Sequence, residues 1–160
     1  MIVYQCEDTL ESIFTAIYNA YEEHRDHNDT VIALHRDLML FAEYIPVAAD
    51  NEKAEKVIRT LQRKFGEEDY RSICYALSAP DPEKAQAVYR TIVKGLKAPV
   101  RAGHLLDNLA DDDCNKVFSL ARAAGRECHH LMGFVRFREV QSGILYSVIG
   151  PKAHILTFLM

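Results

Sequence analysis

The spacing of apolar residues predicts a mainly helical chain. Apolar side chains recur every three or four positions in several segments. Three of these segments follow residues that are typical of helix starts, namely Asp8, Asp50 and the pair Asp81-Pro82. Gly66 is expected to end the second helix. The predicted helices cover about residues 9–22, 50–64, 67–77, 82–97 and 111–132, and a single further turn is expected near 104–109.

Strand patterns are weaker and lie mostly at the two ends of the chain. Residues 2–5 are β-branched and aromatic, and residues 43–47 have the same character with Pro46, which favours an edge strand. After Gly133 the period changes to two, which predicts a hairpin over 134–149 with Ser142-Gly143 as its turn. Residues 30–42 have no clean period. The predicted fold is α+β: one domain over residues 1–160, with five to six helices on a small, mainly antiparallel sheet formed by the N-terminal strand, the middle strand and the C-terminal hairpin.

The helix over 111–132 has two different faces. Val117, Ala121, Ala124, Cys128 and Leu131 share one face, and arginine and histidine side chains share the other. Gly125 lies at the edge of the apolar face, where we expect it to permit a close approach of another backbone.

Charge is distributed unevenly along the chain. The overall net charge is −4, but residues 1–53 carry a net charge of −8 and residues 115–160 a net charge of +4. A basic segment in an acidic protein is a hint of an anionic partner, and arginine matches phosphate oxygens well. The candidate nucleic-acid-binding residues are Arg122, Arg126, His129, Phe134, Arg136 and Arg138. The alternative is that these side chains are simply solvated faces of a helix and a strand.

Other candidate chemistry has simpler interpretations. Cys128 and His129 are adjacent on a helix and point apart, His24 and His27 lie in a polar loop, and Asp111-Asp112-Asp113 suits the first turn of a helix. The four cysteines form no close pair, so buried thiols are expected. Phosphate-binding glycine motifs and nucleophile motifs are absent. We therefore expect no cofactor, no metal and no catalysis by this chain alone. The sequence has neither a signal peptide nor an apolar run of about 20 residues, so a cytoplasmic protein without a membrane partner is expected.

Three segments carry a resemblance to a known family. "EKAEKVIRTLQRKF", "YRSICYALSAPDPEKAQAVYRTIVKGL" and "ARAAGRECHHLMGFVRFREVQSGILYSVIGPKAHIL" resemble a bacterial family named for DNA metabolism or DNA repair, which contains a domain of unknown function. The resemblance is most specific in "GFVRFRE" and "SGILYS", and residues 24–42 match poorly. Family members continue beyond "HIL", so the chain is expected to be the N-terminal part of a longer pattern.

The resemblance implies a setting more than a mechanism. Its members are typically encoded beside a radical-SAM protein, itself linked to DNA modification or repair, and some are fused to a uracil-DNA glycosylase-like domain. It implies an accessory, DNA-handling component with DNA and the radical-SAM protein as partners. One alternative is an adapter that docks on the radical-SAM protein through Phe134, Phe158 and the apolar C-terminus without touching DNA. That terminus is also a candidate dimer contact. A metal-dependent hydrolase using Asp111–Asp113 is a third hypothesis.

Replacing both Arg136 and Arg138 with Ala is expected to weaken DNA binding and to flatten its dependence on salt. Each arginine that neutralises a phosphate releases about one counterion, so its loss lowers the salt slope by about 0.7–0.9. Fluorescence anisotropy with short single- and double-stranded DNA at two salt concentrations measures both quantities. An unchanged affinity and slope would contradict DNA contact by this strand.

Overall fold

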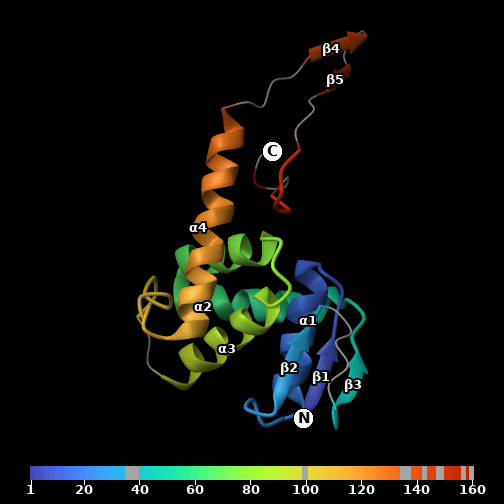
Figure 1. The fold of residues 1–160 in the computed structure, drawn as a ribbon, viewed down its shortest axis with the longest axis vertical. Helices are drawn as coiled ribbons and strands as arrows, with labels where there is room; N and C mark the ends of the chain where they lie inside the picture. Colours follow the sequence, from blue (N-terminus) through green and yellow to red (C-terminus); the bar gives the residue numbers. More distant parts are fainter. Residues whose placement is uncertain are drawn as a thin grey trace.

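The computed structural model describes residues 1–34, 40–98, 101–133, 138–141, 144–146, 150–155 and 158. The elements are β1 (Ile2–Gln5), α1 (Leu10–Glu22), β2 (Thr30–Ala33), β3 (Glu43–Pro46), α2 (Asn51–Ser78), α3 (Lys84–Lys97), α4 (Asp112–Met132), β4 (Arg138–Gln141) and β5 (Ile144–Tyr146). Figure 1 shows a body made of the sheet of β1, β2 and β3 with the helices, from which the second half of α4 projects.

The main sheet is parallel, so the predicted antiparallel sheet is wrong. Its strand order is β2-β1-β3, and β1 pairs in parallel with both neighbours. The N-terminal strand is therefore the central strand. The C-terminal hairpin is confirmed as an antiparallel pair, β4 with β5, but it forms a separate two-stranded sheet. The turn residues Ser142 and Gly143 lie outside the described residues.

The error has a physical cause in the shortness of β2. Only four residues form this strand, and its apolar residues Val31 and Ile32 are too few to establish a period of two. Once β2 is recognised, residues 2–33 read as strand, helix and strand. Parallel neighbours need a crossover of this kind, because the chain must return to the same end of the sheet. Two short strands joined through α1 therefore dictate the parallel pairing.

The described residues form four helices instead of the predicted five to six. The two helices expected on either side of Gly66 follow one another directly and form the single element α2, and the expected interruption at Gly66 is confirmed, because its backbone is not helical (φ +87°). Glycine adopts this left-handed conformation without the steric cost that other residues incur. The expected turn near 104–109 adds no helix, and α3 begins at Lys84, two residues after Pro82. The α+β class itself stands.

The predicted helix starts hold for α2 and α4 and are wrong for α1 and α3. Asp50 caps α2 and Asp111 caps α4, each through its side-chain oxygen. At α3 the N-cap is Glu83, without a side-chain hydrogen bond, and not the predicted Asp81. At α1 the cap is Thr9, whose hydroxyl accepts a hydrogen bond from the Ser12 amide at 3.2 Å. Asp8 instead lies 2.6 Å from the ammonium group of Lys84, which is fully buried. The Asp8 carboxylate compensates the positive charge of Lys84, whose burial without a partner would be strongly unfavourable.

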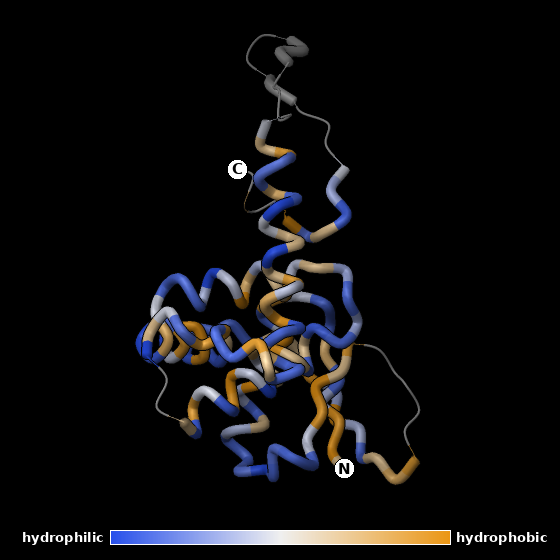
Figure 2. Tube along the Cα trace, turned by 60° about the vertical axis from the view of Figure 1, so that its left-hand side comes forward, coloured by the Kyte–Doolittle hydropathy of each residue, from blue (hydrophilic) through white to orange (hydrophobic). Residues whose placement is uncertain are grey.

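The core lies between the sheet and the helices. Tyr4 and Ile32 are buried with Ile13 and Phe14 of α1. Figure 2 shows hydrophobic residues concentrated in the strands at the base of the body, whereas hydrophilic and hydrophobic positions alternate along α4. Within the described part of the chain, no helix has the length and apolar character required to cross a membrane.

Both outer edges of the main sheet carry a residue that limits further strand pairing. At the β3 edge, Pro46 has no N–H to donate, as its predicted edge position requires. At the β2 edge, the side-chain amide of Gln86 from α3 takes the place of a neighbouring strand. Its oxygen accepts from the Ile32 amide at 2.8 Å, and its nitrogen donates to the Thr30 carbonyl at 3.5 Å.

Asp69 fixes the loop between α3 and α4. The carboxylate is buried and accepts hydrogen bonds from the amides of Gly103 and Leu105, at 3.0 and 3.1 Å. These bonds place the buried Leu105 and Leu106 against the helices. Burial raises the pKa of Asp69 above its ordinary value, although the two amide hydrogen bonds oppose that shift.

Replacing Asp69 with Ala is expected to lower the free energy of unfolding by about 1–3 kcal/mol, because the buried Leu105 amide loses its acceptor and the Gly103 amide keeps only its bond to the Phe65 carbonyl. Asp69→Asn, the matched variant, keeps an acceptor oxygen and carries no charge. The folded protein holds the Asp69 proton more tightly than the unfolded chain does, so wild-type stability falls as pH rises from the ordinary Asp pKa through the raised one. Urea unfolding across this pH range should show that the stability of Asp69→Asn rises relative to that of wild type as the pH increases. Equal stability of wild type and Asp69→Ala would refute the role.

Candidate nucleic-acid interface

A groove with basic walls lies between the second half of α2 and α4. Its volume is about 790 Å³. Arg71 and Tyr75 of α2 form one wall. Three of the predicted residues, Arg122, Arg126 and His129, lie along the other wall on α4. The structure thus brings these three together with Arg71, which the sequence analysis did not select.

The local sequence of α4 explains why its basic side chains face the groove. Val117, Ala121, Ala124 and Cys128 are buried, as the predicted apolar face requires. Arg122, Arg126 and His129 follow one another at intervals of four and three residues, so they form one exposed stripe. The inward residues are mostly small, which allows α4 to pack closely on α2.

Two contacts orient the arginines of α4. The guanidinium carbon of Arg122 lies 5.6 Å from the centre of the Phe118 ring, a cation–π arrangement that leaves the other guanidinium face available. The Nε of Arg126 donates to the Arg122 carbonyl at 3.3 Å. Glu68 is the acidic residue among the described lining residues. Three arginines against one glutamate give the groove a net positive charge suited to phosphate.

Arg71 was missed because its role depends on tertiary packing. It lies on α2, which carries charged residues on several sides, and no sequence pattern separates it from Arg59 or Arg63. Only the packing of α2 against α4 shows that Arg71 faces the same groove as Arg122. Glu68, Arg71 and Tyr75 recur at helical spacing, which becomes informative once α2 and α4 are known to be neighbours.

Three predicted residues remain, and the structure describes only one of them, Arg138. Phe134 and Arg136 lie outside the described residues. Arg138 is the first residue of β4, where it is opposite Tyr146 in a hairpin that lies beyond the end of α4 (Figure 1). Of the apolar C-terminus that was a candidate dimer contact, residues 156, 157, 159 and 160 are also outside the described part.

Gly125 opens onto the groove, and the expected close approach of another backbone is absent from the described structure. A Cβ atom placed on Gly125 would meet no atom within 4 Å. At Gly95 of α3, by contrast, a Cβ would lie 2.4 Å from Leu105 Cδ1, so packing explains that glycine. A glycine inside a helix costs about 1 kcal/mol relative to alanine. Packing among the described residues therefore does not explain Gly125.

The cysteines and neighbouring histidines of α4 have no metal-site geometry. Cys128 is buried, with its sulfur 3.7 Å from the Phe158 carbonyl, whereas His129 and His130 are exposed. No group of three His, Cys, Asp or Glu side chains in the described ranges is arranged to hold a metal ion. Cys6, Cys74, Cys114 and Cys128 are all buried free thiols, as predicted. Burial raises the pKa of Cys6 to about 12, which disfavours a reactive thiolate.

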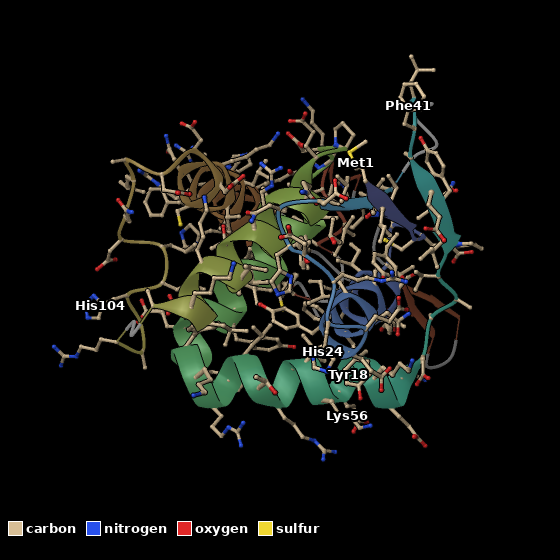
Figure 3. All side chains as sticks on the ribbon, turned by 90° about the horizontal axis from the view of Figure 1, so that it is seen from below. Met1, Tyr18, His24, Phe41, Lys56 and His104 are labelled. Atoms are coloured by element: carbon tan, nitrogen blue, oxygen red, sulfur yellow. The ribbon has the colours of Figure 1, made fainter. Side chains whose placement is uncertain are left out.

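His27 is a packing residue of the loop after α1. Its Nδ1 is 2.6 Å from the hydroxyl of Tyr89, and its ring contacts Tyr21 with 4.5 Å between centroids. Burial lowers the pKa of His27, so the neutral ring is favoured. His24 follows α1 at a positive φ of 49° (Figure 3). These contacts support the sequence interpretation of a structural loop.

A second, apolar pocket of about 240 Å³ lies where α1, α2 and α3 meet. Tyr18 and Lys56 line it and are labelled in Figure 3, with the Lys56 nitrogen 5.3 Å from the Tyr18 ring centre. Ligand sites usually combine an apolar lining with several convergent polar groups. This pocket has an almost wholly apolar lining, so the basic groove is the stronger candidate.

One protein-family model matches part of this chain. Residues 82–160 match the model of a family described as a domain of unknown function, DUF4130. The matched region contains α3, α4 and the hairpin, and so only the α4 wall of the groove. The chain matches none of the curated proteins and none of the solved structures with which it was compared.

The acidic triplet Asp111-Asp112-Asp113 has a structural role at the start of α4. One Asp111 oxygen accepts from the amides of Asp113 and Cys114, both at 3.1 Å. The ammonium group of Lys94 pairs with the Asp111 and Asp113 carboxylates, at 2.5 and 2.8 Å. The hydrogen bond from Lys94 lowers the pKa of Asp111. The carboxylates of Asp111 and Asp113 are thus occupied by an internal cation.

Replacing Asp111 with Ala is expected to lower the free energy of unfolding by about 1–2 kcal/mol, because α4 loses its N-cap. Asp111→Asn is the matched variant, since asparagine caps helices about as well. The Asp111 pKa is depressed in the folded state, so its contribution is present above its ordinary pKa and is lost as pH falls through the depressed value. Thermal unfolding with and without Mg²⁺ tests the rival view. A stabilisation by Mg²⁺ that Asp111→Asn abolishes would instead indicate a metal site.

Proposed function

We propose that this chain is a non-catalytic, nucleic-acid-handling component of a bacterial DNA repair or base-modification pathway, acting in the cytoplasm beside a radical-SAM protein. The observation that carries the proposal is the groove between α2 and α4, in which Arg71, Arg122 and Arg126 converge. Guanidinium groups on both walls suit a ligand with several phosphates in a row. The resemblance of the sequence supports DNA as that ligand.

The pairing and burial of the titratable side chains favour an accessory role over catalysis. Asp111 and Asp113 are paired with Lys94, and the four cysteines are buried. Asp8 and the buried Lys84 are paired with each other, so this pair stabilises the fold at the carboxyl end of β1. Among the described residues, the groove therefore offers binding groups and no recognisable nucleophile with a base beside it.

The second candidate is an adapter that docks on the radical-SAM protein without contacting DNA. Leu40 and Phe41 support it, because they are 86% and 98% exposed beside the edge strand β3 (Figure 3). Phe158, which the sequence assigned to such a surface, packs on Tyr75 with 4.5 Å between ring centroids. Phe158 is therefore less suited to docking than Phe41.

Replacing Arg122 and Arg126 with Ala is expected to weaken DNA binding by about tenfold to a hundredfold at low salt, equivalent to about 1.4–2.8 kcal/mol. The magnitude of the salt slope should fall by about 1.4 for a single strand, because two phosphate contacts are lost. Fluorescence anisotropy of a labelled oligonucleotide at several salt concentrations measures both effects.

The matched control is Arg59→Ala with Arg63→Ala, which removes two exposed arginines of α2 that do not line the groove. This control should bind nearly as wild type does. Equal losses in the two double variants would show that only net charge matters. If wild type bound neither single- nor double-stranded DNA at low salt, the DNA-handling role would be rejected in favour of the adapter.

A further inference from the structure

The lining of the groove includes a glycine, Gly125. Gly125 lies between Arg122 and His129 along the exposed stripe of α4, and all three residues line the groove. Among the residues that the structure describes, none has an atom within 4 Å of a Cβ placed on Gly125. A glycine inside a helix disfavours folding, and this one faces open space in a basic groove. The position therefore points to the close approach of a ligand.

The surroundings of Gly125 restrict what that ligand is. Arginines stand on both sides of the space, Arg71 from α2 and Arg122 and Arg126 from α4, so the ligand is an extended anion and not a single charge. The Arg122 guanidinium rests on the Phe118 ring at 5.6 Å, which makes a flat platform beside Gly125. Guanidinium planes and aromatic rings of this kind stack on unpaired bases.

The Arg122–Phe118 platform distinguishes one strand from two. In a duplex the bases are stacked on one another, so this platform would have no base to receive. A single strand satisfies both the arginines and the platform.

We propose that the groove binds an unpaired polynucleotide strand whose backbone passes directly over Gly125. This inference rests on the proposed function and deepens it, since it names the strand state of the ligand and the point of closest approach. Gly125 is then a residue kept small for the ligand and not for the fold.

The test uses the full chain, three single variants and the Arg122→Ala, Arg126→Ala double variant, with dT12, a 12-base-pair duplex and inorganic polyphosphate as probes. Gly125→Leu places a side chain in the groove and should reduce dT12 affinity by more than about tenfold. Gly125→Ala should raise the urea midpoint of unfolding, because alanine is the better helix former, while reducing dT12 affinity by a smaller factor. Ala123→Leu is the matched control. It adds a side chain at an exposed α4 position that does not line the groove, and it should bind dT12 as wild type does.

The expected order of wild-type affinity is dT12 first, with the duplex and polyphosphate at least about tenfold weaker at equal salt. Duplex binding as tight as dT12, or unchanged dT12 affinity in Gly125→Leu, overturns the inference. If Arg122→Ala with Arg126→Ala still weakens binding in that case, the proposed function survives. Polyphosphate binding equal to dT12 also overturns the inference, because bases would then contribute nothing. No binding of either DNA probe rejects the proposed function itself, and the inference with it.

Discussion

The bend of α2 at Gly66 is the constraint on which the rest of the helical body depends. On its N-terminal side α2 packs on α1 through residues such as Val57 and Leu61, and on its C-terminal side it forms the groove with α4. A straight helix of this length could not serve both partners. The left-handed conformation at Gly66 (φ +87°) gives the change of direction, and the Phe65 carbonyl next to it accepts from the Gly103 amide at 2.8 Å. The loop before α4 is thereby attached to the bend itself.

The Asp69 contacts extend the same connection. Asp69 lies one helical turn after Gly66, and its carboxylate binds two amides of the loop that leads to α4. The position of α4 relative to α2 is thus determined by polar contacts at the bend and by small apolar residues further along. The groove walls are consequently set by the bend, since Arg71 and Arg122 can face each other only if both helices keep this arrangement.

Local patterns in the sequence predicted the helices better than they predicted the sheet. The faces of α4, its acidic start, the Asp50 cap, the edge position of Pro46 and the C-terminal hairpin were predicted from local signals, whereas the caps of α1 and α3 were not. β2 was missed because four residues are too short to show a period, and without it the parallel topology could not be derived. Within the candidate site, the stripe of Arg122, Arg126 and His129 was predictable from helical spacing. Arg71 and the open space over Gly125 were not, because both depend on which helices become neighbours.

The Gln86 contact with β2 has a consequence for how copies of this protein behave beside one another. An exposed strand edge offers amides and carbonyls to any other extended chain, and edge-to-edge pairing is a common route to aggregation. Gln86 already occupies the Ile32 amide and the Thr30 carbonyl, the groups that an incoming strand would need at that register. A second chain could extend the sheet there only by displacing this side chain from both bonds. The β2 edge of the sheet is thus closed by the Gln86 side chain of the same chain, which hinders the addition of a strand from another molecule.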